Sequence, residues 1–187
     1  MVERQINGVG CFDRNSLIKN VSGIYLFMKR AMDIAISLSA VVLLSPVLFI
    51  IGGLIGRRPQ GLVLNIEEKY GFGGRRFQAY EFKSIVNNPI IRKLPLLFNV
   101  LKGDMSLIGP LPIPAEDLRP NPWYQLRMSA KPGITGLWQI TERAGAMEEM
   151  VRVDLKYIRE RNLQNDFKIL LKSIYLLLGG KKRNLLP

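Results

Sequence analysis

The sequence contains no histidine and only one cysteine, Cys11. Without histidine, acid–base catalysis by imidazole, a Ser-His-Asp triad and the usual histidine-containing zinc sites are excluded. A lone cysteine cannot form an intrachain disulfide. Any chemistry of this chain therefore depends on carboxylates, lysine and arginine, hydroxyl groups or the backbone.

Acidic residues are also scarce. The 187 residues include 27 Lys and Arg but only 15 Asp and Glu, which gives a net charge of +12. This length suits one modest domain with an attachment element rather than two full domains. A basic domain favours an anionic partner, such as acidic lipid headgroups, a nucleotide diphosphate or nucleic acid, although ordinary surface charge is the simpler alternative.

Charge is absent altogether from residues 34–56. As an α-helix this run is about 34 Å long, enough to cross a hydrocarbon core of about 30 Å. It begins too far into the chain for a secretory signal. Pro46 removes one helical hydrogen bond near its middle, and the hydroxyl of Ser45 can satisfy a freed carbonyl. We therefore expect a membrane-inserted helix that breaks at Ser45 and Pro46.

The flanks of this run are equally basic, so the positive-inside tendency gives no orientation. Two basic flanks fit best if both stay in the cytoplasm, which predicts a re-entrant helix; a simple span is the alternative. Residues 166–178 form a second candidate membrane contact, because apolar residues recur there at helical spacing before a Gly-Gly pair and a basic cluster. A core helix with a solvated tail is the alternative for this segment.

The remaining pattern predicts a mostly helical α+β fold. We expect a polar arm over residues 1–22, the membrane-inserted helix over 23–56 and a cytoplasmic domain over 57–187. Within that domain, alternation predicts a short β-hairpin from residues 62–66 and 75–85, with a glycine-rich turn between them. Helices are expected over 94–102, 146–161 and 166–178, and an extended stretch over 134–140.

Several blocks occur in a recognisable order behind the apolar run. They are MKRAMDI at 28–34, GFGGRRFQAYEFKSI at 71–85, LPLLFNVLKGDMSLIGP at 94–110 and KPGITGLWQI at 131–140. From about Tyr25 to its end, the chain resembles the monotopic phosphoglycosyl transferases, the bacterial sugar transferase family. The last two blocks are the most specific part of this resemblance.

The resemblance implies a re-entrant helix in the bacterial inner membrane and a site at its cytoplasmic face. The family moves a sugar phosphate from a nucleotide diphosphate-sugar to undecaprenyl phosphate, which begins polysaccharide or glycoconjugate assembly. An Asp-Glu pair and magnesium carry out this chemistry: the Asp attacks phosphorus while the cation neutralises the diphosphate.

The chain departs from the family at this acid pair. The two positions directly before the Leu-Pro of the third block are Arg92 and Lys93, and no Asp or Glu occurs between Phe82 and Gly103. Two cations would repel Mg²⁺, and arginine does not deprotonate to attack phosphorus. A phosphoramidate on a lysine would require burial to lower its pKa, and we give it little weight. The sequence therefore predicts no metal site here.

Other family positions keep charged residues. Lys83, Lys131 and Arg143 are candidates for binding a phosphate or nucleotide, with an exposed strand lysine and a surface arginine as simpler alternatives for the first and last. Asp104 and Glu142 are the fallback acids, although Asp104 more simply caps a turn.

Three functions follow from this reading. The favoured one is a catalytically inactive relative that keeps its membrane docking and works as a partner or regulator in glycan assembly, without a cofactor. The alternative is an active transferase that uses relocated acids and magnesium. A nucleic-acid-binding protein is the weakest, because the apolar run contradicts a freely soluble protein and no nucleic-acid motif is present. The expected partners are membrane lipid, including undecaprenyl phosphate, a nucleotide diphosphate-sugar, and a glycan-assembly protein or a second copy of the chain.

Overall fold

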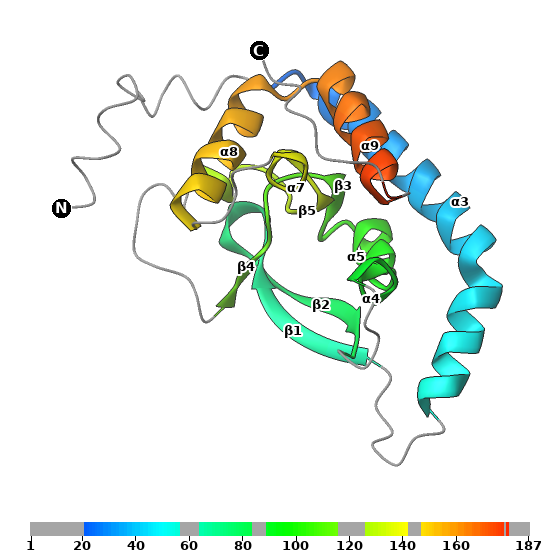
Figure 1. Cartoon of the computed structure of the whole chain (residues 1–187). Coiled ribbons are helices and arrows are strands. Elements are labelled where there is room, and N and C mark those ends of the chain that lie inside the picture. Colours follow the sequence, from blue (N-terminus) through cyan, green and yellow to red (C-terminus); the bar gives the residue numbers. More distant parts are fainter. Residues whose placement is uncertain are drawn as a thin grey trace.

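In the computed structural model a small mixed domain packs against one long helix, α3 (Figure 1). The structure describes residues 21–56, 64–83, 89–115, 126–141, 147–177 and 179. Nearly all of the predicted arm over residues 1–22 lies outside these ranges. Helices together with short sheets confirm the predicted mostly helical α+β class.

Helix α3 (Gly23–Gly56) contains the whole uncharged run and begins well before it. Pro46 lies inside the helix, which continues past it rather than ending there. The Ser45 hydroxyl donates a 2.8 Å hydrogen bond to the carbonyl of Val42, four residues before the proline, so the predicted role of this serine is confirmed. The stretch Gly23–Ile50 is long and apolar enough to cross a membrane, with a mean hydropathy of 2.2 and only 11% of its most apolar window buried. Whether it spans or re-enters stays a prediction.

The first turns of α3 fix it to the domain. Lys29 forms a 2.8 Å ion pair with Asp166, and Arg30 donates hydrogen bonds of 2.6 and 2.8 Å to the carbonyls of Val100 and Leu101. Beyond Val41, the described side chains of α3 up to Ile50 are largely exposed, as Leu43 at 77% and Phe49 at 85% show. Apolar side chains this exposed on one helix are accounted for by a lipid environment.

The predicted hairpin is confirmed, with its first strand longer than expected. Strands β1 (Leu64–Tyr70) and β2 (Arg76–Phe82) pair antiparallel from Leu64 opposite Phe82 to Tyr70 opposite Arg76. The turn η1 (Phe72–Gly74) has two glycines in the left-handed region, where other residues would be strained. Strand β4 (Ile113–Pro114) adds to the other edge of β1, so the order is β2-β1-β4.

A second, parallel pair consists of β3 (Ser106–Ile108) and β5 (Gly133–Thr135). The extended stretch predicted over 134–140 is therefore wrong beyond Thr135, because the chain turns at Gly136 into helix α7 (Leu137–Ile140). The turn is tight: a Cβ on Gly136 would collide with the carbonyl of Gly109, which directly follows β3. Only glycine lets the backbone approach this closely.

Four helices complete the described domain: α4 (Pro89–Lys93), α5 (Leu96–Lys102), α8 (Met147–Glu160) and α9 (Leu163–Leu177). The predicted helices over 94–102, 146–161 and 166–178 are confirmed with small shifts. Asn99 of α5 is fully buried and ties this helix to β2, accepting from the N–H of Tyr80 at 3.1 Å and donating to the carbonyl of Gln78 at 2.6 Å. The hydrophobic core lies between α5, β3, α8 and α9.

Helix α9 lies beside the start of α3 (Figure 1). It buries Asp166, Ile169 and Ser173 against the domain. Phe167 and Tyr175 on its other side are 53% and 58% exposed. The helix thus contributes to the core and also presents apolar side chains outward, and contact of that outward face with a membrane stays a prediction.

Candidate functional site

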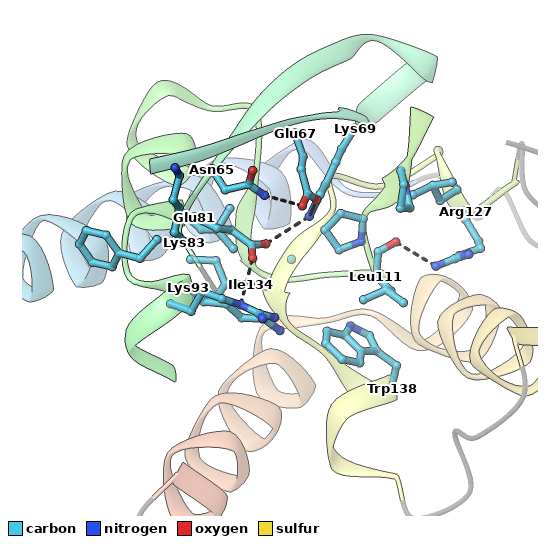
Figure 2. A pocket seen from close by; sticks show the side chains of 17 residues that line it. Asn65, Glu67, Lys69, Glu81, Lys83, Lys93, Leu111, Arg127, Ile134 and Trp138 are labelled. Atoms are coloured by element: carbon cyan, nitrogen blue, oxygen red, sulfur yellow. Dashed lines mark hydrogen bonds and ion pairs between the residues drawn. The ribbon is translucent and has the colours of Figure 1, made fainter. Parts of the chain in front are cut away.

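A cavity of about 590 Å³ opens between the β-hairpin, α4 and α7. The hairpin and α4 contribute charged side chains, and α7 contributes an indole (Figure 2). Its walls contain Asn65, Glu67, Lys69, Glu81, Phe82, Lys83, Arg92, Lys93, Leu96, Leu111, Pro112, Ile113, Pro114, Arg127, Gly133, Ile134 and Trp138.

The register of the hairpin explains why polar groups gather on this face. Glu81 of β2 lies opposite Asn65 of β1, and Glu67 lies opposite Ala79. Because strand side chains alternate between faces and cross-strand partners share a face, Asn65, Glu67, Lys69 and Glu81 all project to the same side. Glu81 is only 9% exposed, which is unusual for a carboxylate and requires compensating partners.

Cations supply those partners. The Nζ atom of Lys69 lies 3.3 Å from Oε2 of Glu67 and 3.2 Å from Oε1 of Glu81, so one ammonium lies between two carboxylates. Arg92 Nε lies 3.5 Å from Oε2 of Glu81, and Asn65 donates a 2.7 Å hydrogen bond to Glu67 (Figure 2). Both carboxylates of the cavity are thus already engaged by positive or donating groups.

Lys93 lies in a different environment from its neighbour Arg92. Its ammonium lies 5.2 Å from the centre of the Trp138 ring. Burial lowers the pKa of Lys93, the nearby Glu81 carboxylate counteracts this, and Lys69 and Arg92 lower the pKa further. The ammonium is desolvated and has two cations as well as one carboxylate nearby, and its desolvation favours an anion beside it.

Arg127 closes the far wall of the cavity. Its guanidinium lies 2.7 Å from Oδ2 of Asp154 and donates a 2.9 Å hydrogen bond to the carbonyl of Leu111. The N–H of Leu111 donates to the same Asp154 oxygen at 3.1 Å. This buried pair therefore holds the Leu111 peptide in place. Burial raises the pKa of Asp154 to about 7, although Arg127 counteracts the shift.

The structure brings together only some of the residues singled out from the sequence. Lys83, Arg92 and Lys93 line the cavity. Lys131 does not: it lines a separate cavity beside α3. Asp104 follows α5 and lines neither of these two cavities. Glu142 and Arg143 lie outside the described residues.

Sequence reasoning missed Glu67, Lys69, Glu81 and Arg127. The stretch that contains no acidic residue begins at Phe82, one residue after Glu81. A signal was present, because Glu81 shares its alternation phase with Phe77 and Ala79, which are both buried. Glu68, the neighbour of Glu67, is exposed and pairs with exposed Arg76. Glu67 is also half-exposed but faces the cavity.

Comparison with known proteins gives one consistent family. The profile described as bacterial sugar transferase matches residues 24–90 and 90–180. A UDP-N-acetylgalactosamine-undecaprenyl-phosphate N-acetylgalactosaminephosphotransferase of Aeromonas hydrophila is 34% identical over 192 residues, covering 85% of this chain and 45% of that protein. An undecaprenyl-phosphate galactose phosphotransferase of Salmonella typhimurium is 31% identical, covering 88% of this chain and 43% of its own length.

The chain spans less than half the length of these two relatives. A shorter relative is the exopolysaccharide production protein ExoY of Sinorhizobium fredii, which is 25% identical over 84% of this chain and 87% of its own length. This relative is therefore little longer than the segment that matches the present chain. The two profile matches meet at residue 90, two residues before Arg92.

Proposed function

Because the chain belongs to the bacterial sugar transferase family, we propose that its 590 Å³ cavity binds the diphosphate of a nucleotide diphosphate-sugar without catalysing magnesium-dependent transfer. The chain would act at the cytoplasmic face of the bacterial inner membrane, as a partner or regulator in polysaccharide or glycoconjugate assembly. The single observation that supports this is that Arg92 and Lys93, at the positions of the family's acid pair, line the cavity as cations.

Charge supports an anionic ligand. Lys69, Lys83, Arg92 and Lys93 outnumber the two carboxylates of the cavity, while Arg127 on the far wall is paired with Asp154. A diphosphate offers oxygen acceptors to these donors, and charge-assisted hydrogen bonds are the stronger kind.

Buried donors point to the same ligand. Within the described ranges, Nε1 of Trp138 is buried without a hydrogen-bond acceptor, and the buried Nε of Arg92 has only its 3.5 Å ion pair with Glu81. Buried donors are normally satisfied by the protein, by water or by a ligand. Both belong to residues that line the cavity, so ligand oxygens would satisfy them.

The donor set does not fit magnesium. Mg²⁺ takes oxygen ligands in octahedral geometry, usually from carboxylates together with water and phosphate. In the described part of the chain no three acidic or cysteine side chains come together as a metal site, and the ammonium of Lys69 lies between the two carboxylates of the cavity. No step of the proposed function therefore depends on a metal.

One observation favours a second candidate, an active transferase with relocated acids. Glu67 and Glu81 both line the cavity, whereas the fallback acid Asp104 does not. Released from Lys69, one of these carboxylates could attack the sugar-linked phosphorus and displace a nucleoside monophosphate. This candidate is weaker, because both carboxylates are already paired with cations.

Binding and turnover distinguish the two candidates. The full chain in detergent is titrated calorimetrically with several UDP-sugars, with Mg²⁺ or with EDTA, and nucleoside monophosphate release is measured with undecaprenyl phosphate present. We expect binding that survives EDTA, no release, and about tenfold weaker binding in Lys83→Met, which loses one charge-assisted contact. Lys102→Met, which removes an exposed charge outside the cavity, should bind like the native chain.

Failure of every UDP-sugar to bind would overturn the binding proposal. Magnesium-dependent release abolished by Glu67→Gln or Glu81→Gln would establish the second candidate instead. Release abolished by Asp104→Asn or Glu142→Gln would establish the relocated acids expected from the sequence.

A further inference from the structure

A second cavity, of about 330 Å³, lies where the first turns of α3 meet the domain. Four cationic residues line it: Lys29 and Arg30 from α3, Lys131 from the segment before β5, and Arg161 from the segment between α8 and α9. Leu26 and Phe72 add apolar surface, and Phe72 is 54% exposed. No residue of this cavity lines the 590 Å³ cavity.

Two of these cations form contacts that join α3 to the rest of the domain. Lys29 is paired with Asp166 at 2.8 Å, and Arg30 binds two carbonyls at the end of α5. The one acid in the wall, Asp33, accepts a 3.1 Å hydrogen bond from the N–H of Leu107. These contacts do not involve the other two cations of the wall.

Lys131 and Arg161 are these two cations. Among the residues that the structure describes, nothing accepts a hydrogen bond from Lys131 or forms an ion pair with it. Arg161 donates a 3.3 Å hydrogen bond to the carbonyl of Ser129, and its Nε is buried without an acceptor in the same ranges. Burial and the neighbouring Arg30 lower the pKa of Lys131, and the carboxylates of Asp33 and Asp104 counteract this shift. An anion in this cavity would satisfy both groups.

The position of the cavity along α3 identifies the source of that anion. Lys29 and Arg30 precede the uncharged run, which begins at Ile34, by four to five residues, or about 6 to 7.5 Å of helix. A bilayer's headgroup layers are each about 5 to 8 Å thick outside the hydrocarbon core. The cavity therefore lies at headgroup depth if the uncharged run fills the hydrocarbon, and exposed Ile24 and Phe27 continue the apolar surface beside it.

We infer that this cavity binds the phosphate of an anionic membrane lipid, with Lys131 and Arg161 as its ligands and Leu26 and Phe72 against the upper acyl chain. The inference goes beyond the nucleotide cavity, because it assigns Lys131 to a lipid and leaves Lys83 for the nucleotide. It also gives the membrane a contact with the domain itself, in addition to the insertion of α3.

The test uses the full chain in detergent and three probes: dihexanoyl phosphatidylglycerol, dihexanoyl phosphatidylcholine and inorganic phosphate. Isothermal titration should show phosphatidylglycerol binding about tenfold more tightly than either other probe. Lys131→Met should weaken phosphatidylglycerol binding about tenfold, as expected for loss of one charge-assisted contact. Lys131→Arg keeps the charge and should retain the affinity for phosphatidylglycerol within about threefold. It also shows whether the chain still folds when this position is substituted.

Two controls separate this site from the nucleotide cavity. Lys102→Met removes an exposed charge that lines neither cavity and should bind phosphatidylglycerol like the native chain. A saturating UDP-sugar should leave phosphatidylglycerol binding unchanged. Displacement of the lipid by the UDP-sugar, or native-like lipid binding by a folded Lys131→Met chain, would overturn the inference. Inorganic phosphate that binds as tightly as phosphatidylglycerol would assign the cavity to free phosphate and overturn the lipid assignment.

Discussion

Arg92 Nε lies 3.5 Å from Oε2 of Glu81, so a cation and a carboxylate of the cavity wall face each other. The two come from separate elements, α4 and β2, and meet through tertiary packing alone. Glu81 also contacts Lys69, which makes it the carboxylate that two cations share. This arrangement leaves the cavity with cations in excess, and it determines how the cavity responds to substitution.

Glu81→Gln should destabilise the fold and tighten anion binding. It leaves Lys69 and Arg92 without their shared partner inside a largely buried wall, at an expected cost of about 1–3 kcal/mol in the free energy of unfolding. With one negative charge removed, UDP-sugar affinity should rise severalfold. Glu68→Gln is the matched control, since the pair of Glu68 with Arg76 is exposed and should contribute below about 0.5 kcal/mol. Thermal unfolding and calorimetric titration measure both quantities, and equal effects of the two variants would contradict the role of Glu81.

Asp154 should make stability depend on pH between about pH 4 and pH 7. Its pKa in the folded chain, about 7, lies above the ordinary value because the carboxyl is buried. Between these values the folded chain holds a proton that the unfolded chain has released. The stability contributed by Asp154 is thus fully present below about pH 4 and is lost as pH rises through 7, by at most about 1.4 kcal/mol per pH unit.

Asp154→Asn removes this titration while keeping the shape of the side chain. Chemical unfolding of the native and variant chains at pH 5 and pH 8 measures the effect. The native chain should lose more stability than the variant between these pH values. An equal loss in both would show that Asp154 stays ionised beside Arg127 throughout.

Asp166→Asn should loosen the attachment of α3. The carboxylate of Asp166 is fully buried and accepts from Lys29 at 2.8 Å, from Tyr25 at 2.9 Å and from Tyr157 at 2.8 Å. Burial and this carboxylate raise the pKa of Tyr157 well above its ordinary value, so its hydroxyl remains a donor. Breaking the buried pair should cost about 3–5 kcal/mol.

The effect is measured by thermal unfolding and by protease cleavage between α3 and the domain. Glu160→Gln is the control, because its pair with Arg159 is exposed. A destabilisation by Asp166→Asn no larger than that of this control would contradict the anchoring role.

The topology of α3 can be settled by labelling single cysteines in intact cells. Cys11 is the only native cysteine and precedes the helix, and Gln60→Cys in a Cys11→Ser background places one after it. A re-entrant helix leaves both in the cytoplasm, so a membrane-impermeant maleimide should label neither until the cells are permeabilised. Labelling of one position alone in intact cells would establish a single span.

Much of the fold follows from local sequence. The long helix follows from an uncharged run, and the hydrogen bond of Ser45 follows from the carbonyl that Pro46 frees. The end of α5 at Gly103 follows from the left-handed conformation that glycine adopts at a helix end. The local sequence does not show where strand β5 ends and helix α7 begins. The turn between them at Gly136 depends on contact with Gly109, far away in the sequence.

By itself the sequence predicted the family and the long apolar helix, because each depends on which residues occur and in what order. Only the tertiary structure decided which charges share a cavity. The hairpin register brings Glu67 and Glu81 to one ammonium. Packing against α3 moves Lys131 into a different cavity from Lys83. The reason is physical: side chains meet according to strand register and helix packing, which join residues that sequence spacing keeps apart.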